Sequence, residues 1–337
     1  MVQTIFVKEA LKQDAVFIDT RTPAEYEEDH LPHAINIPIF SNEERAIVGT
    51  IYQQVSQEQA IEQGVEIFSQ KLPHFLKEIS QYKDRQIIIY CWRGGMRSKT
   101  VTALLESLNY HVLQLEGGHK AYRTYIRERL TNFQLKPKLI VLWGLTCTGK
   151  TSLIKKLSPS INLEGLAQHR GSLYGALSLK PNSQKKFENL LLQQLEKLNE
   201  QPYLFVEGES RKIGDVQIPD FFYKAMKNGL HIHITRNIDL RTQKAVKEYL
   251  PAEIDLQQFQ EITLRLPHII SNKRKQEICD LFHQNQLITG VKIILEEYYD
   301  QLYAHTLKQI NFSFEINSDN EDLAINGIME KIKLFVH

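Results

Sequence analysis

The stretch YCWRGGMRSKT at residues 90–100 decides how the first half of the chain folds. The apolar run QIIIY (86–90) before it predicts a buried strand, and SKTVTALLESLNY (98–110) carries apolar residues at helical spacing. AVFIDT (15–20) and HVLQLEGG (111–118) predict two further strands. Strands that alternate with helices form a parallel sheet, which binds ligands at the carboxyl ends of its strands. The quoted stretch lies at such an end.

Cys91 occupies the turn between this strand and this helix. Gly94 and Gly95 give the turn backbone freedom, and successive N–H groups that lead into a helix form a concave site for anions. Arg93 and Arg97 add positive charge, and such surroundings favour the thiolate over the thiol. A buried cysteine that closes a strand is the alternative. We predict that Cys91, Arg93 and Arg97 are catalytic and that Cys91 is a nucleophile.

Length and composition bound the class of protein. A chain of 337 residues predicts two domains, and a net charge of +1 neither requires nor excludes a nucleic-acid partner. No apolar run approaches the length of a membrane span, and the N-terminus lacks the pattern of a secretory signal, so we expect a cytoplasmic monomer with no membrane contact. The three cysteines lie far apart, which argues against a disulfide framework and a cysteine zinc site.

The second half repeats the strand and helix pattern after a polar linker, TNFQLKPK (131–138). We place one domain at 1–132 and the other at 138–337, the latter with a helical C-terminal part. The segment GLTCTGKT (144–151) follows the strand KLIVLW and fits the phosphate-binding P-loop pattern in its required context. The residues predicted to bind phosphates or a metal are Gly144, Thr148, Gly149, Lys150, Thr151 and Ser152. Lys150 would reach the outer phosphoryl oxygens, and Thr151 could hold Mg²⁺ if a metal is used.

Acidic and basic residues follow a later strand, YLFVEGES. Glu207 and Glu209 stand where P-loop proteins often carry the carboxylate that orders metal-bound water, and Arg211 follows them. A solvated turn is the alternative interpretation. Between residues 211 and 275 Lys and Arg outnumber Asp and Glu, with aromatic residues among them. This segment could bind an RNA backbone, although a solvated helical face explains it equally well.

The first half resembles a rhodanese domain. The resemblance rests on FIDTRTPAEYEEDHLPHAINIP (17–38) and CWRGGMRS (91–98), and it covers roughly residues 4–130. It implies that Cys91 carries sulfur or selenium, and that Asp19 and Arg21 form a structural, salt-bridged turn. One departure matters, because the C-x5-R spacing from Cys91 to Arg97 is one residue longer than in sulfurtransferases. It matches rhodanese-fold phosphatases and arsenate reductases, whose wider loop surrounds a tetrahedral oxyanion.

Both halves together resemble the bacterial tRNA 2-selenouridine synthase family, a rhodanese domain fused to a P-loop domain. The resemblance extends to SNEERAIVGTIYQQ (41–54), LEGGHKAYR (115–123), LEGLAQHRGSLYG (163–175) and VEGESRKIG (206–214). It implies a transferase that converts wobble 2-thiouridine of a tRNA anticodon loop into 2-selenouridine. In this family selenophosphate is the donor, and an S-geranyl-2-thiouridine intermediate is made from geranyl diphosphate.

The residues fit these implied steps. Cys91 could accept the selenium or hold the donor while Arg93 and Arg97 neutralise its phosphate. The P-loop would cradle geranyl diphosphate, although ATP and GTP stay open as ligands, as does a need for Mg²⁺. His119, His169 and its neighbour Arg170 are further candidates for substrate contact. The pattern predicts no haem, flavin or zinc.

Three alternatives stay open from the sequence. The first is a plain rhodanese-type sulfurtransferase with a nucleotide-binding regulatory domain. The second is a phosphatase or arsenate reductase, which the C-x5-R spacing suggests. The third is a non-catalytic protein that binds RNA or serves as a scaffold. Cys147, at a variable P-loop position, and Cys279, in a helical segment, are expected to have no chemical role.

Overall fold

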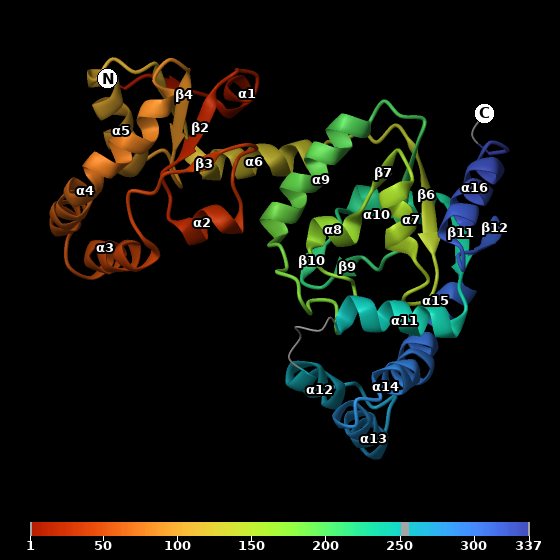
Figure 1. Cartoon of the computed structure of the whole chain (residues 1–337). Helices are drawn as coiled ribbons and strands as arrows, with labels where there is room; N and C mark the ends of the chain where they lie inside the picture. The colour runs from red at the N-terminus through yellow and green to blue at the C-terminus, as the bar shows by residue number, and fades with distance from the viewer. Residues whose placement is uncertain (1, 251–255, 336–337) are drawn as a thin grey trace. The chain divides into compact units, whose positions relative to one another are not determined.

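Two structural units make up the chain in the computed structural model, which describes residues 2–250 and 256–335. They comprise Met1–Asn132 and Phe133–His337, and each has its own parallel sheet (Figure 1). The boundary between the units lies in the polar segment that the sequence indicates as a linker.

The first unit is built on a five-stranded parallel sheet in the order β1-β5-β4-β2-β3. Two of its central strands are buried along their whole length and, apart from Asp19, are apolar, as expected for a sheet covered on both faces. The strands are β1 (Thr4–Ile5), β2 (Val16–Asp19), β3 (Ile35–Asn36), β4 (Ile87–Tyr90) and β5 (Val112–Leu115). The three strands predicted from the sequence are thus confirmed as β2, β4 and β5.

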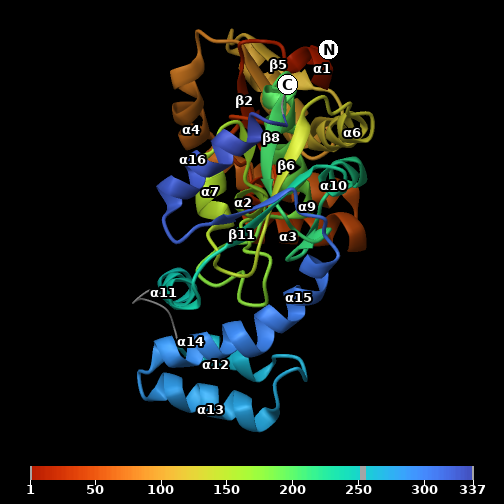
Figure 2. The same cartoon turned by 90° about the vertical axis from the view of Figure 1, so that its right-hand side faces the viewer.

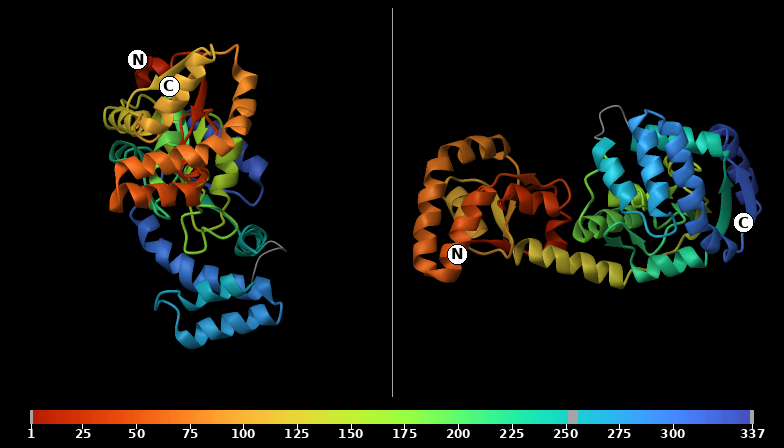
Figure 3. Two further views of the ribbon diagram at one scale, coloured as in Figure 1. Left: turned by 90° about the vertical axis from the view of Figure 1, so that its left-hand side faces the viewer. Right: turned by 90° about the horizontal axis from the view of Figure 1, so that it is seen from below.

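Six α-helices surround this sheet. They are α1 (Val7–Ala10), α2 (Pro23–Glu28), α3 (Asn42–Gln54), α4 (Gln57–Ile79), α5 (Met96–Ser107) and α6 (Gly118–Thr131). A short 3₁₀ turn, η1 (Ser80–Tyr82), follows α4. Capping boxes begin two of them, with Thr22 and Glu25 at α2 and Ser41 and Glu44 at α3. Figure 3 shows α3 and α4 in orange beside the sheet, and the helix predicted after the cysteine turn is α5.

A buried ion pair fixes the turn that follows β2. The guanidinium of Arg21 lies 2.6 Å from the carboxylate of Asp19, and both side chains are inaccessible to solvent. Arg21 also donates to the carbonyl of Asp29, and the amide of Asn36 donates to the carbonyls of Asp19 and Arg21. The pair therefore has the structural role that the resemblance implies.

The second unit contains a five-stranded parallel sheet in the order β12-β11-β6-β8-β7. The strands are β6 (Lys138–Trp143), β7 (Ser160–Ile161), β8 (Tyr203–Glu207), β11 (Leu230–Thr235) and β12 (Phe314–Asn317). A separate hairpin joins β9 (Lys212–Ile213) to β10 (Val216–Gln217). Because β6 is central, the loop after it lies at the middle of the sheet's carboxyl edge, where ligands bind in such folds.

Helices of the second unit fall into two groups. Those associated with the sheet are α7 (Lys150–Lys156), α8 (Leu163–Ala167), α9 (Gln184–Leu198), α10 (Asp220–Lys227), α11 (Ile238–Tyr249) and α16 (Glu321–Ile332). The others are α12 (Leu256–Leu264), α13 (Asn272–His283), α14 (Leu287–Ile294), a π-helical turn η2 (Leu295–Tyr299) and α15 (Asp300–Lys308). In Figures 1 and 2, α12, α13 and α14 lie together, away from the strands. The sequence predicts a helical C-terminal part, whereas this group lies between β11 and β12, and the chain then returns to the sheet with β12 and α16.

This group of helices has its own apolar core, in which aromatic rings pack against α11. Cys279 is buried in α13, in agreement with the expectation that it is a core residue. Within residues 2–250 and 256–335, no helix combines the length and the apolar character that a membrane crossing requires.

Candidate active sites

The turn between β4 and α5 places Cys91 at the carboxyl end of the sheet. Gly94 has a φ of 64°, and a Cβ there would lie 3.0 Å from backbone atoms of residues 115 and 117, so only glycine fits. Gly95 caps α5 with extended backbone, and a Cβ there would meet no atom within 4 Å. The turn therefore requires glycine at position 94. At position 95 a side chain would meet open space.

A second glycine turn, between β5 and α6, packs against the cysteine loop and donates hydrogen bonds to it. The backbone N–H of His119 donates to the carbonyl of Cys91, and that of Lys120 donates to the carbonyl of Trp92. A Cβ on Gly118 would lie only 2.3 Å from the carbonyl oxygen of Cys91. This support was not foreseen, although the segment LEGG could have indicated it.

The thiol of Cys91 is 3% exposed and has a positioned hydrogen-bond donor. The Oγ atom of Ser98 lies 3.2 Å from Sγ and itself accepts a 2.8 Å hydrogen bond from the amide of Gln114. The same amide donates to the carbonyl of Gly94. Since Ser98 accepts from Gln114, its own proton can be donated either to the sulfur or to the carbonyl of Gly95, 3.3 Å away. Sequence reasoning missed both Ser98 and Gln114.

The two arginines of the loop differ in their surroundings. Arg93 is exposed, whereas Arg97 lies 2.8 Å from the carboxylate of Glu25 on α2. Burial opposes the charge on Glu25, but the hydrogen bond and charge of Arg97 hold the pKa of this carboxyl below its ordinary value. Arg97 therefore forms an ion pair with Glu25, and the sequence did not predict this contact.

His119 lies in the interior of the first unit rather than at a substrate surface. Its side chain is 1% exposed, and its Nε2 atom lies 3.1 Å from the buried carboxylate of Asp29. Arg123 lies 3.6 Å from the same carboxylate. The expectation that His119 contacts substrate is therefore wrong, because it is buried in the network that holds the start of α6.

The P-loop connects β6 to α7. Gly149 has a φ of 94° at the start of α7, and a Cβ on Gly144 would lie 2.4 Å from the carbonyl oxygen of Ile234. Thr148 is buried and donates to the carbonyl of residue 145, 2.9 Å away. The ammonium of Lys150 donates to the carbonyls of Gly144 and residue 145, at 2.9 and 3.2 Å. Lys150 thus lies across the loop whose N–H groups would bind phosphates.

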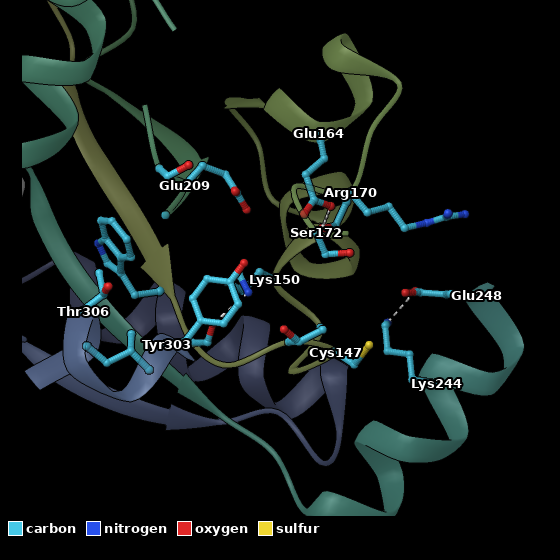
Figure 4. A pocket seen from close by; sticks show the side chains of 18 of the residues that line it. Cys147, Lys150, Glu164, Arg170, Ser172, Glu209, Lys244, Glu248, Tyr303 and Thr306 are labelled. Carbon is cyan, nitrogen blue, oxygen red and sulfur yellow. Dashed lines mark hydrogen bonds and ion pairs between the residues drawn. The ribbon is translucent and has the colours of Figure 1, made fainter. Parts of the chain in front are cut away.

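A cavity of about 290 Å³ opens over this loop (Figure 4). Of the predicted residues, those that line it are Gly144, Gly149, Lys150, Thr151, Arg170 and Glu209. Its other charged residues are Glu164, Lys244 and Glu248, none of which was predicted. Its apolar wall includes Trp143, Tyr223, Tyr249, Tyr303 and Leu307. Charged side chains and aromatic side chains therefore both line the cavity.

Three glutamates gather near the P-loop. Glu164, in the first turn of α8, accepts a 2.7 Å hydrogen bond from the hydroxyl of Thr151. Glu207 is fully buried at the end of β8, where burial and the nearby charge of Glu164 raise its pKa to about 8. Burial and Glu164 also raise the pKa of Glu209. At neutral pH, Glu207 is therefore largely protonated. Throughout the described ranges, no group of three or more His, Cys, Asp or Glu side chains has the arrangement of a metal site.

Replacing Glu207 by glutamine is expected to flatten the pH dependence of stability. Between its ordinary pKa of 4.5 and its folded pKa of about 8, Glu207 binds more proton in the folded than in the unfolded state. The free energy of unfolding therefore falls as pH rises through this window, by up to about 5 kcal/mol, and glutamine removes this contribution. Urea unfolding of both proteins at pH 5.5 and 8.5 measures the difference, and parallel pH profiles would contradict the assignment.

Five predicted residues lie outside the cavity wall. The prediction that Arg211 belongs to the site is wrong, because this residue does not line the cavity and forms an exposed ion pair with Asp220. Ser152 accepts a hydrogen bond from Lys244. His169 accepts from the N–H of residue 171, and burial lowers its pKa. Thr148 and Glu207 are buried beneath the loop.

Arg170 and Cys147 both line the cavity. The guanidinium of Arg170 lies over the ring of Tyr249, 5.0 Å from its centre, and donates to the carbonyl of Leu177. Arg170 points away from Lys150 in Figure 4. Burial raises the pKa of the Cys147 thiol to about 12, so this cysteine is not a thiolate at neutral pH, in line with its expected lack of a chemical role.

Some cations of the basic segment between residues 211 and 275 are paired with carboxylates of the second unit. Arg241 forms a 2.5 Å ion pair with Asp300, and Arg274 pairs with Glu297 and Glu277. Lys275 is buried. These pairs weaken the argument that the segment offers a positively charged surface to RNA.

Two family models match the chain, one in each unit. Residues 6–125 match the rhodanese-like domain family, and residues 137–263 match the family described as tRNA 2-selenouridine synthase AAA domain. A crystal structure of the N-terminal domain of a Clostridium difficile 630 protein is 45% identical, with a TM-score of 0.36. The similarity covers 37% of this chain and 98% of the chain in that crystal structure.

Two curated relatives are similar over most of their length. A tRNA 2-selenouridine synthase of Nitrosomonas europaea is 35% identical over 79% of this chain and 71% of its own length. One of Shewanella frigidimarina is 30% identical over 89% of this chain and 90% of its own. Similarity across both units does not favour the alternative of a plain sulfurtransferase. The chain therefore belongs to the tRNA 2-selenouridine synthase family.

Proposed function

We propose that this protein is a transferase that replaces the sulfur of wobble 2-thiouridine in tRNA by selenium from selenophosphate. The reaction passes through S-geranyl-2-thiouridine, made from geranyl diphosphate, and takes place in the cytoplasm. The observation that carries the proposal is the presence of two separate sites, one in each unit of a chain related to the synthases along most of its length. Each site suits one of the two steps.

The P-loop cavity suits the geranylation step. The loop N–H groups and Lys150 bind the diphosphate, and the aromatic wall, which includes Tyr303 and Trp143, contacts the apolar chain. The protonated Glu207 does not repel the diphosphate. The nucleoside sulfur attacks the first carbon of the geranyl group, so that a C–S bond forms while the C–O bond to diphosphate breaks, and the N3 proton of the nucleoside passes to water. Lys150 stabilises the charge that the leaving group acquires.

Magnesium fits this site. Mg²⁺ is bound in proteins by one or two carboxylates together with substrate phosphates. The hydroxyl of Thr151 and the carboxylate of Glu164 are adjacent oxygen donors at the loop, and they would hold the ion. When bound, it would supply positive charge to the diphosphate.

The Cys91 loop suits the release of selenium from its donor. Its C-x5-R spacing gives room for a tetrahedral phosphorus centre, and Ser98 steadies the sulfur. We assign the attack on phosphorus to Sγ of Cys91: the S–P bond forms, the P–Se bond breaks, and hydroselenide leaves with the bonding electrons. Hydroselenide then attacks C2 of the nucleoside, where the C2–Se bond forms and geranylthiol leaves with the proton. Water hydrolyses the S–P bond and restores the thiol.

Mass spectrometry of nucleosides tests the proposal. Thiolated tRNA is incubated with the protein and geranyl diphosphate, and then with selenophosphate. Two successive changes are expected, first the mass of a geranyl group added to 2-thiouridine and then the mass of 2-selenouridine. Selenium incorporation without any geranylated nucleoside, in a time course with both substrates, would contradict the order of steps.

A further inference from the structure

An apolar groove opens beside the cysteine loop in the first unit. It has a volume of about 150 Å³ and lies between α3, α4 and the start of α5. Only Tyr52, Arg97 and Thr100 among its lining residues carry polar side-chain atoms. Val65 and Met96, which also line it, are 62% and 50% exposed, so the groove is open to solvent. Neither proposed reaction step uses it so far.

Gly64 forms part of the groove wall, where it is buried and closely approached by the ring of Phe40. It lies inside α4, a helix of 23 residues, where glycine is the least favourable residue after proline. Its φ is not positive, and a Cβ there would lie 3.2 Å from the ring of Phe40. Any larger side chain at this position would extend into the groove. The glycine thus keeps the space open at a cost in helix stability.

Two adjacent residues at the start of α5 contact the groove and the thiol of Cys91, respectively. Arg97 lines the groove, and Ser98, the next residue of α5, lies 3.2 Å from Sγ of Cys91. Met96 and Arg97, which lie at the end of the cysteine loop, both line the groove, so the groove borders that loop. The lining selects hydrocarbon, because a polar group placed there would lose its hydrogen bonds to water.

We infer that this groove binds the geranyl chain of the S-geranyl nucleoside while selenium replaces the sulfur, an inference that rests on the proposed function. An apolar cavity of about 150 Å³ is large enough for a six-carbon ring such as benzene. The geranyl group consists of two five-carbon units. The outer unit fits the groove, and the inner unit extends from its mouth to the sulfur at C2. The groove thereby distinguishes the geranylated nucleoside from 2-thiouridine and holds the leaving group.

Two variants and a matched control test this inference. Gly64→Leu fills the groove, and Val65→Glu places a charge on its wall at an exposed position that does not endanger folding. Ile47→Glu is the control, because Ile47 is 53% exposed on α3 but does not line the groove. The probes are two anticodon stem-loop RNAs of the same sequence, one with S-geranyl- and one with S-methyl-2-thiouridine.

Binding of both RNAs is measured for each protein by fluorescence anisotropy. The wild type and Ile47→Glu are expected to prefer the geranylated RNA by at least about tenfold, since burial of two or more methylene groups has this effect. Gly64→Leu and Val65→Glu are expected to lose most of that preference. Both should still geranylate thiolated tRNA at the wild-type rate, because this step uses the P-loop cavity of the second unit. Thermal unfolding followed by circular dichroism shows separately that the first unit of each variant is folded.

Three results would overturn the inference. They are a wild type that binds both RNAs equally, a Val65→Glu variant that keeps the full preference, and an Ile47→Glu variant that loses it. A groove that serves self-association would appear as an oligomer that Val65→Glu dissociates, without any preference for geranylated RNA. The proposed function is judged separately, because it fails if the wild type forms no 2-selenouridine or forms it without the geranylated nucleoside.

Discussion

A Lys150→Ala variant is expected to lose geranylation of thiolated tRNA by about 10²–10³-fold, the usual effect of removing one group that stabilises transition-state charge. The ammonium of Lys150 lies across the P-loop, within 3.2 Å of two loop carbonyls. When diphosphate leaves, this is the cation of the loop nearest the developing charge. The rate of appearance of S-geranyl-2-thiouridine, followed by mass spectrometry, measures the loss.

The control for this variant is Lys155→Ala. Lys155 lies on the same helix, α7, but is exposed and does not line the cavity. Its replacement should leave geranylation unchanged. Lys150→Ala should still convert pre-geranylated tRNA into 2-selenouridine, because that step uses Cys91. A Lys150→Ala protein that geranylates tRNA at the normal rate would remove the P-loop from the mechanism.

A Cys91→Ala variant is expected to lose formation of 2-selenouridine from pre-geranylated tRNA by at least about 10³-fold, as expected when a nucleophile is removed. No other thiol can replace it in this loop, because the two remaining cysteines belong to the second unit. The measurement is selenium incorporation from selenophosphate. Added hydroselenide should restore the product, since it bypasses the attack on phosphorus.

Cys147→Ala serves as the matched control for Cys91→Ala. Burial raises the pKa of the Cys147 thiol to about 12, and the residue lines the P-loop cavity rather than the selenium site. With pre-geranylated tRNA as substrate, its replacement should therefore leave selenium incorporation intact. A Cys91→Ala protein that makes 2-selenouridine from selenophosphate as fast as the wild type would exclude Cys91 as the nucleophile.

Local sequence patterns were enough to predict the strands and loops that carry both sites. The run QIIIY is apolar at every central position, which only a strand buried on both faces explains, and it forms β4. The P-loop pattern likewise depends on a few adjacent residues. Lys150 and Cys91 were therefore found correctly as parts of such loops, although their catalytic roles stay predictions.

Partners that are distant in the chain could not be predicted from the sequence. Glu25 lies 72 residues from Arg97, and Gln114 lies 16 residues from Ser98. Glu164 reaches Thr151 only because α8 returns beside the P-loop. Such contacts depend on the order of strands in the sheet, which the spacing of apolar residues does not encode. Arg211 shows the converse, since its closeness in sequence to Glu209 did not bring it into the cavity.

The central claim is that two independent sites act in succession on one tRNA, and mixing the two inactive variants tests it most directly. Lys150→Ala and Cys91→Ala are combined with thiolated tRNA, geranyl diphosphate and selenophosphate, and 2-selenouridine is measured. The claim predicts that each variant alone makes none, whereas the mixture makes it, because Cys91→Ala releases geranylated tRNA that Lys150→Ala completes. A mixture that stays inactive, although Lys150→Ala converts added geranylated tRNA, would contradict it.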